Sequence, residues 1–361
     1  MSEENLPLGS KFATRASDDG RKPHIARLND AITKAHGLQE ALDARGIDLT
    51  DDKTPVYIFG YGSLPNQPHY HSGDIKSASA SFEVIDGLAA GYKRDFSVAC
   101  SRSGTNTNPG IVYGLDRDAD SVQYGGVLSY QGLSLEEKAE NLTKFIDRES
   151  MEVNGHQVYR FDIIDVEVEG GQTRPCLVCI ADEAAPGYRG NLSYDDKVEV
   201  IATTHNAVVE EGKPPTEVHP DSTVKDKRNV QASYGYFQQF AVMPIAERIG
   251  RPAPTTDFAA RCDAAIEAED RHIETMCDDI ERYRETQLTP AEHLFMLQAE
   301  LKDTDWFKDF GDDETHKEQM RLRIATLTEK IATLERDMSV SPPPPHGHDV
   351  DGDNLDNAPG F

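Results

Sequence analysis

Residues 56–64 read VYIFGYGSL, an apolar run that ends in the turn sequence Gly60-Tyr61-Gly62-Ser63. A short apolar run closed by glycines is typical of a buried strand that enters a tight turn. Because glycine adopts conformations closed to other residues, this turn can present consecutive backbone N–H groups to a carboxylate or phosphate oxygen. Taken alone, such a stretch is most often a plain tight turn.

The sequence after this turn predicts a β-rich domain. One helix is expected, from Ser134 to Asp147, and its first residues Ser134-Leu135-Glu136-Glu137 fit a capping box. Many strands with few helices indicate an α+β fold, with a barrel-like or strongly curved sheet and helices outside it. The expected strands lie at 56–59, 81–88, 94–99, 110–115, 121–129, 158–168 and 174–181.

The composition divides the chain into parts. Residues 1–54 are polar, with one weakly amphipathic helix expected between His24 and Arg45, and the sequence Arg251-Pro252-Ala253-Pro254 marks a domain boundary. Helices are also expected at 193–211 and 231–249, and residues 212–229 read as an insertion rich in proline and charge. The expected parts are an N-terminal extension (1–54), a main domain (55–250), a helical or coiled-coil extension (255–338) and a disordered tail (339–361).

The C-terminal extension is predicted to be helical throughout. An acidic helix is expected at 257–284, and a second starts at Thr289, where Thr289-Pro290-Ala291-Glu292 fits a helix N-terminus. The last segment carries a heptad seam, which predicts either an intrachain helical hairpin or a self-associating coiled coil. The seam residues are Met320, Ile324, Leu327, Ile331, Leu334 and Met338.

Charge and cysteine content limit the classes of function. The net charge of -27 over 361 residues disfavours binding to nucleic acid or to anionic membranes. No run approaches the roughly 18 apolar residues of a membrane span, and the N-terminus lacks a secretory signal. The five scattered cysteines indicate reduced thiols in a cytoplasm, and Cys176 and Cys179 are interpreted as core side chains, not as metal ligands.

Two charged residues are candidates for chemistry. Glu149 lies at the C-terminal end of the helix predicted at 134–147, just before the next β region. The helix dipole disfavours an anion there, so its presence indicates a role. The alternative is a solvated helix-end charge that Arg148 offsets. Arg102 offers a forked donor for a carboxylate, and its alternative is a salt bridge within a loop.

Several short motifs occur in an order that resembles the ChaC-type γ-glutamylcyclotransferases, the glutathione-degrading branch of that superfamily. The resemblance covers about residues 56–250. It departs from the family at Pro65-Asn66-Gln67-Pro68, where the family has an aliphatic residue and Trp, and at Ser101-Arg102-Ser103-Gly104, where it has His-Arg-Gly. The matching motifs are YIFGYGSL (57–64), GYKRDFS (91–97), NPG (108–110), GGV (125–127), FIDRE (145–149) and GYRGNLS (187–193).

This resemblance implies a small β-barrel with flanking helices and a γ-glutamyl substrate such as glutathione. It implies Glu149 as the acid/base, the backbone of Tyr61-Gly62-Ser63-Leu64 as the substrate cradle, and Arg102 and Tyr188 as further binding residues. The reaction needs no metal or cofactor, because the substrate's own α-amine is the nucleophile. Two alternatives stay open: a cyclotransferase acting on γ-glutamylamines or γ-glutamyl dipeptides, and a non-catalytic binding protein with the same fold.

Overall fold

The computed structural model describes residues 9–51, 53–62, 83–100, 109–130, 132–204, 253–307 and 314–340. The helix predicted at 231–249, the insertion predicted at 212–229 and the tail after Val340 lie outside the described residues.

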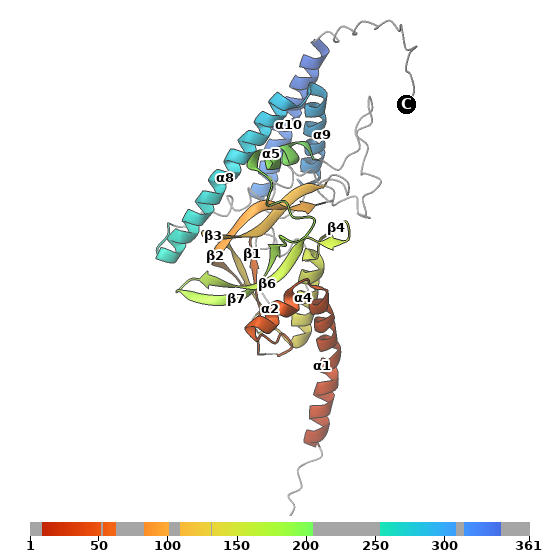
Figure 1. Ribbon diagram of the computed structural model, residues 1–361, viewed down its shortest axis with the longest axis vertical. Helices are drawn as coiled ribbons and strands as arrows, with labels where there is room; N and C mark the ends of the chain where they lie inside the picture. The colour runs from red at the N-terminus through yellow and green to blue at the C-terminus, as the bar shows by residue number, and fades with distance from the viewer. Residues whose placement is uncertain are drawn as a thin grey trace, which may run out of the picture.

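Five strands form a closed barrel in the order β1-β3-β2-β6-β7, which confirms the predicted fold class (Figure 1). Strand β1 closes it, pairing antiparallel with β3 and parallel with β7. Strands β4 (Glu152–Val153) and β5 (His156–Gln157) form a separate two-stranded sheet. The barrel strands are β1 (Tyr57–Gly60), β2 (Glu83–Cys100), β3 (Gly110–Ser129), β6 (Tyr159–Val168) and β7 (Gln172–Ala181).

Strands β2 and β3 correct the sequence prediction. Each joins two stretches that were expected to be separate strands, because the β2–β3 ladder continues across glycines and charged residues that looked like breaks. The ladder shifts register between Ala90 and Tyr92, where Gly91 has a φ of 83°, and again between Phe96 and Val98. Such bulges bend a long hairpin without ending its pairing.

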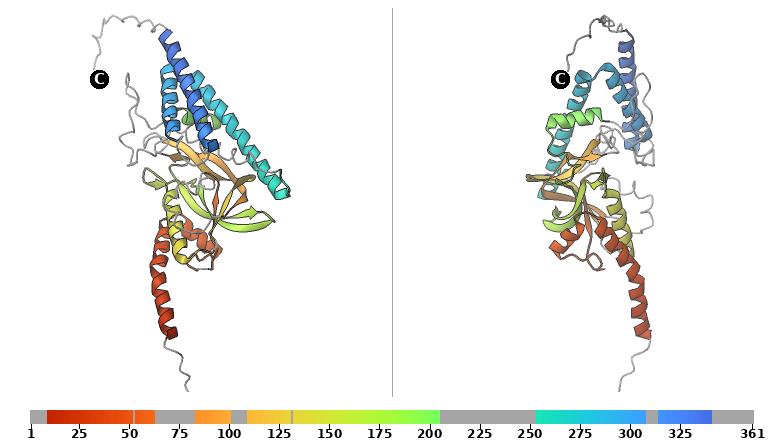
Figure 2. Two further views of the ribbon diagram at one scale, coloured as in Figure 1. Left: turned by 180° about the vertical axis from the view of Figure 1, so that it is seen from behind. Right: turned by 45° about the vertical axis from the view of Figure 1, so that its right-hand side comes forward.

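Three large apolar clusters organise the core. One takes side chains from all five barrel strands and from no helix, so it fills the barrel. Another joins one side of the sheet to the helices at the start of the chain and to α4 (Leu135–Glu149), and the third joins β2 and β3 to later helices. The barrel is therefore covered by helices from both ends of the chain (Figure 2).

The N-terminal residues pack on the barrel. The single helix expected between His24 and Arg45 is two helices, α1 (Gly9–Lys34) and α2 (Leu38–Arg45). They are separated at Gly37, whose φ of 82° suits glycine and whose Cβ, if present, would lie 2.7 Å from the Arg160 side chain. Buried side chains of both helices, including Leu28 and Leu42, belong to the cluster with α4.

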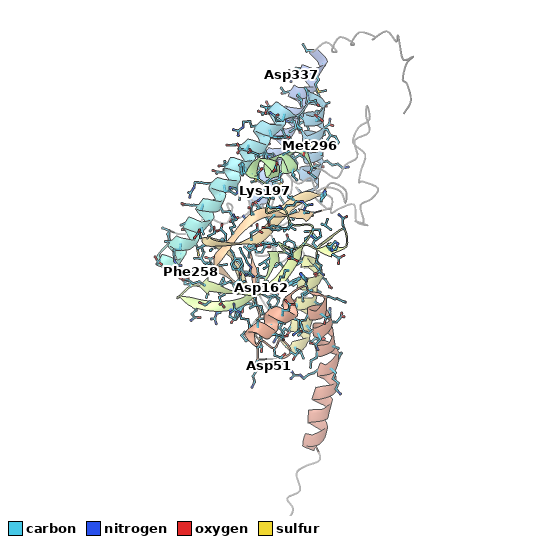
Figure 3. The ribbon with its side chains drawn as sticks, viewed as in Figure 1. Asp51, Asp162, Lys197, Phe258, Met296 and Asp337 are labelled. Atoms are coloured by element: carbon cyan, nitrogen blue, oxygen red, sulfur yellow. The ribbon has the colours of Figure 1, made fainter. Side chains whose placement is uncertain are left out.

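On the other side, α5 (Tyr194–Thr203) and α8 (Asp257–Gln287) pack on β2 and β3. Helices α9 (Pro290–Phe307) and α10 (Glu314–Val340) pack against each other beyond them (Figures 1 and 3). Helix α9 starts where the sequence predicts, because Thr289 and Glu292 form the expected reciprocal cap. The α10 seam packs within the chain, where Leu327 and Ile331 lie against Leu297 of α9. This is the intrachain alternative, and self-association stays a prediction.

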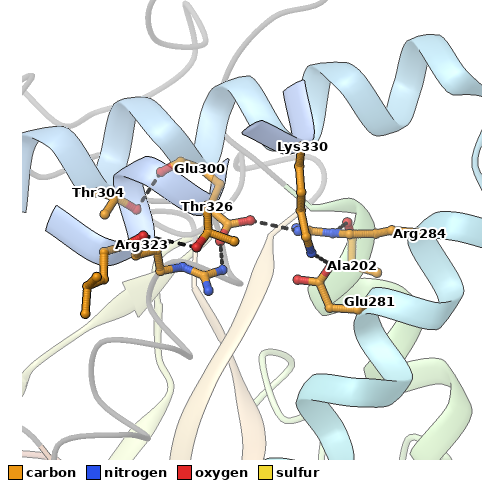
Figure 4. Close-up of polar contacts among 9 residues, drawn as sticks. Ala202, Glu281, Arg284, Glu300, Thr304, Arg323, Thr326 and Lys330 are labelled. Carbon is orange, nitrogen blue, oxygen red and sulfur yellow. Dashed lines mark hydrogen bonds and ion pairs between the residues drawn. The ribbon is translucent and has the colours of Figure 1, made fainter. Parts of the chain in front are cut away.

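A buried ion network links these helices (Figure 4). Glu300 of α9 accepts hydrogen bonds from Arg284 of α8, at 3.0 Å, and from Arg323 of α10. Arg284 also donates to the backbone oxygen of Ala202 in α5, at 3.1 Å. Both Arg284 and Glu300 have fully buried side chains, so the network fixes the three C-terminal helices to α5 and to one another.

Among the described residues, no helix has an apolar stretch long enough to span a bilayer.

Candidate active site

Helix α4 positions Glu149. Ser134 caps the helix by accepting from the Glu137 backbone N–H, and the Glu137 carboxylate accepts from the Ser134 N–H in return. The apolar face of the helix, which includes Phe145 and Ile146, is buried against the barrel. Because α4 ends at Glu149, this packing fixes the carboxylate at the barrel wall.

Strand β1 positions the glycine turn. Gly60 pairs with Gly126 of β3, and the neighbouring Gly125 packs under the end of β1. A Cβ on Gly125 would lie 2.4 Å from the Gly60 oxygen and 2.6 Å from the Phe59 ring, a distance that real contacts do not reach. The absence of a side chain at Gly125 therefore lets β1 and its turn lie close to β3.

The helix end and the turn face one cavity. Glu149 and Arg148 line it from α4, and Tyr61 and Gly62 line it from the turn. The remaining lining residues are Phe59, Gly60, Tyr113, Phe145, Tyr159 and Cys179.

The charges in this cavity form a close pair at its wall. Arg148 Nε lies 3.1 Å from Glu149 Oε1, and both side chains are about one quarter exposed, at 24% and 22%. The Cys179 side chain also lines the cavity. Burial raises the pKa of this thiol well above its usual value, and the nearby Glu149 carboxylate raises it further, so Cys179 stays neutral.

Two aromatic residues connect the cavity wall to the barrel. The Tyr159 hydroxyl donates to the Tyr113 backbone oxygen, which joins β6 to β3. The Arg94 guanidinium lies over the Tyr113 ring, 4.4 Å from its centre, and donates from Nη1 to the Tyr61 oxygen at 2.8 Å. Sequence reasoning singled out none of these three as a site residue, although Arg94 and Tyr113 stand in or beside motifs that it quoted.

Comparison with known proteins shows a similarity over the residues that form the barrel. Residues 56–210 match the family model described as ChaC-like protein. These residues are similar to the ChaC-like family and are here called the ChaC-like domain. No curated protein sequence matches the chain.

Several solved structures are also similar to this chain. One is a γ-glutamyl cyclotransferase from yeast described as specific to glutathione, with 16% identity, a TM-score of 0.36, and coverage of 60% of this chain and 100% of that chain. A structure described as γ-glutamyl cyclotransferase has 14% identity, a TM-score of 0.30, and coverage of 61% and 99%. An uncharacterised protein from Homo sapiens has 14% identity, a TM-score of 0.31, and coverage of 58% and 87%.

The other predicted site residues of the ChaC-like domain have different outcomes. Ser63, Leu64 and Arg102 lie outside the described residues. Tyr188 is not among the described residues that line the cavity; it bridges Val98 through the backbone. Its hydroxyl lies beside Asp116, and burial, followed by the nearby carboxylates, raises its pKa to about 12. Its role in substrate binding stays a prediction.

Cys176 and Cys179 lie on β7 in the ChaC-like domain, and both are buried free thiols. The structure therefore confirms the prediction that both are core side chains. In the part of the chain that the structure describes, no group of three or more His, Cys, Asp or Glu side chains could hold a metal ion.

Proposed function

We propose that this protein is a γ-glutamylcyclotransferase, with Glu149 as the acid/base. The observation that carries the proposal is that Glu149 and the Tyr61-Gly62 turn line the same cavity of a ChaC-like domain. A carboxylate and exposed backbone N–H groups on opposite elements are what an intramolecular amide exchange requires.

The substrate supplies its own nucleophile. In a γ-glutamyl amide, the α-amine nitrogen attacks the γ-carbonyl carbon, a C–N bond forms, and a five-membered ring closes. The original amide C–N bond then breaks and releases 5-oxoproline and an amine. Holding the chain in the folded shape that precedes attack accounts for much of the rate, since effective molarities for such reactions are large.

Glu149 moves the proton in this scheme. The carboxylate takes a proton from the attacking amine and gives it to the departing nitrogen, so one residue serves as base and then as acid. Its position at the cavity wall, partly buried and beside Arg148, supports this role. The Arg148 guanidinium would attract a substrate carboxylate, and the Gly62 N–H would donate to that carboxylate or to the developing oxyanion.

Glutathione is the proposed substrate, with Cys-Gly as the leaving group, because the sequence motifs resemble the glutathione-degrading branch. The departures at 65–68 and 101–104 favour a second candidate in which the leaving group is a simple amine or an amino acid. Both candidates share the γ-glutamyl half and differ only in what leaves.

A substrate panel tests the proposal. The full chain is incubated with glutathione, a γ-glutamyl dipeptide and a γ-glutamylamine, and 5-oxoproline release is measured. We expect release from glutathione at the highest kcat/KM. N-Acetylated glutathione is the control, because its blocked nitrogen cannot attack and it should give no product. Failure to release 5-oxoproline from every compound would contradict the proposed function.

A further inference from the structure

Helix α8 reaches the active-site turn through one ion pair. Arg94 of β2 donates from Nη1 to the Tyr61 oxygen at 2.8 Å, and from Nε to the carboxylate of Glu269 in α8. Its side chain is 1% exposed and that of Glu269 is 16% exposed, so the pair lies largely away from water. Since the family match ends at residue 210, Glu269 comes from outside the matched region.

We propose that Glu269 is a positioning residue for the reaction proposed above, so that the C-terminal helices complete the active site and do not merely extend the chain. Within the described residues, the hydrogen bonds of Glu269 are to Arg94 and Gln123, neither of which lines the substrate cavity. Glu269 acts through Arg94, which contacts two residues of the cavity, Tyr61 and Tyr113.

Both oxygens of Glu269 are engaged. Oε1 accepts from Arg94, and Oε2 accepts from Gln123 Nε2 at 3.2 Å. Gln123 in turn accepts from the Arg94 backbone N–H at 2.6 Å, so the carboxylate, the amide and the guanidinium hold one another in a single geometry. A charged pair that is buried and hydrogen-bonded at both ends is rigid, and breaking it leaves a buried charge without compensation.

This geometry fixes the direction of the turn. The Tyr61–Gly62 peptide is trans, as are all peptides in the described residues, so the Tyr61 C=O and the Gly62 N–H point in opposite directions. When Arg94 holds the carbonyl, the Gly62 N–H must point away from Arg94. Gly62 lines the cavity, and a glycine turn without this anchor could rotate its peptide freely. Glu269 therefore sets the orientation of the N–H group that the proposed mechanism uses.

The rest of α8 is held firmly enough for this role. Phe258 and Cys262 pack on Leu88 of β2, and Ile273 and Met276 pack with Phe96 and Ile111. On the N-terminal side of Glu269, Arg261 pairs with Glu167 of β6. On its C-terminal side, Arg284 donates to the Ala202 backbone oxygen of α5. Glu269 thus lies between two attachments of the helix to the barrel domain.

The test compares Glu269→Gln with the matched control Glu267→Gln. Both changes remove one negative charge from α8, but Glu267 is exposed, and the ion pair described for it is with Arg271 of its own helix, at 3.9 Å. We expect Glu269→Gln to lower kcat/KM for 5-oxoproline release roughly 10-fold, with an unchanged far-UV circular dichroism spectrum. Glu267→Gln should stay within about 2-fold of the wild type. Wild-type kcat/KM in Glu269→Gln would overturn the proposal.

A double-mutant cycle with Arg94→Met separates positioning from general stability. If Glu269 acts through Arg94, adding Glu269→Gln to Arg94→Met should change kcat/KM by less than about 2-fold, because the contact is already lost. A further loss of roughly 10-fold in that background would show that Glu269 acts by another route and would overturn the proposal.

A readout without substrate keeps this proposal separate from the proposed function. Hydrogen exchange at the Tyr61 and Gly62 amides should be faster in Glu269→Gln than in the wild type and unchanged in Glu267→Gln. If the wild type released no 5-oxoproline, the function would fail while faster exchange still supported the positioning role. Equal exchange in all three proteins would overturn that role, whatever the activity.

Discussion

At the scale of single residues, Asp116 shows how burial sets the pH dependence of stability. Its side chain lies on β3 and the residue is 5% exposed. Burial raises the pKa of its carboxyl to about 6, and the neighbouring Asp95 carboxylate adds to the rise while Lys197 opposes it. Because the folded chain holds this proton more tightly than the unfolded chain, ionised Asp116 lowers the free energy of unfolding. This cost is fully present above about pH 6, shrinks as the pH falls, and disappears below about pH 4.

We therefore expect Asp116→Asn to stabilise the protein at pH 7.5, by roughly 2–3 kcal/mol for a shift of this size, and to lose most of that gain at pH 4.5. Thermal unfolding at the two pH values measures the difference. Asp120→Asn, an exposed change on the same strand, should have the same small effect at both. A gain for Asp116→Asn that did not depend on pH would contradict the assignment.

At the scale of helices and strands, Glu300 shows how one carboxylate holds several elements. It lies between Arg284 and Arg323, and its side chain is fully buried (Figure 4). Removing it would leave the guanidinium of Arg284 buried without its counter-charge. Loss of one partner of a buried pair costs about 3–5 kcal/mol, whereas an exposed pair is worth about 1 kcal/mol or less.

Glu300→Ala should therefore lower the free energy of unfolding by about 3 kcal/mol or more, measured by urea denaturation. The control is Glu318→Ala, which breaks the exposed pair with Arg321 and should change the free energy by less than about 1 kcal/mol. Equal effects of the two changes would show that the network does not secure these helices.

Sequence reasoning succeeded where structure is local and failed where it is not. The caps at Ser134 and Thr289 involve residues three positions apart, so they could be read directly from the sequence. The continuity of β2 and β3 depends on pairing between strands, which no local pattern reveals. Glu269 and Arg94 are separated by 175 positions, and only the packing of α8 on the barrel brings them together. The site motifs at Tyr61 and Glu149 were found through their order along the chain.

At the scale of the whole molecule, the C-terminal helices and the barrel share a core. Phe96, Ile111 and Tyr113 of the sheet are buried together with Ile273 and Met276 of α8. Removing the extension would expose this apolar surface and would leave Arg94 without Glu269. The extension is thus expected to contribute both to stability and to the geometry of the turn.

A chain ending at Pro252 tests this expectation. We expect it to aggregate, or to unfold at a temperature at least several degrees below that of the full chain. Exposing each large buried apolar side chain to water lowers the free energy of unfolding by about 1.5–3 kcal/mol. Any soluble fraction should have a reduced kcat/KM for 5-oxoproline release. A truncated chain as stable and as active as the full one would contradict a shared core.

The measurement that tests the central claim most directly is 5-oxoproline release from glutathione by Glu149→Gln, beside Glu152→Gln, which alters an exposed residue of β4. The amide keeps the shape of the side chain but cannot take up the amine proton, so we predict a loss of roughly 100-fold or more in kcat, with an unchanged melting temperature. Glu152→Gln should retain wild-type kcat. Turnover by Glu149→Gln at the wild-type rate would contradict the account.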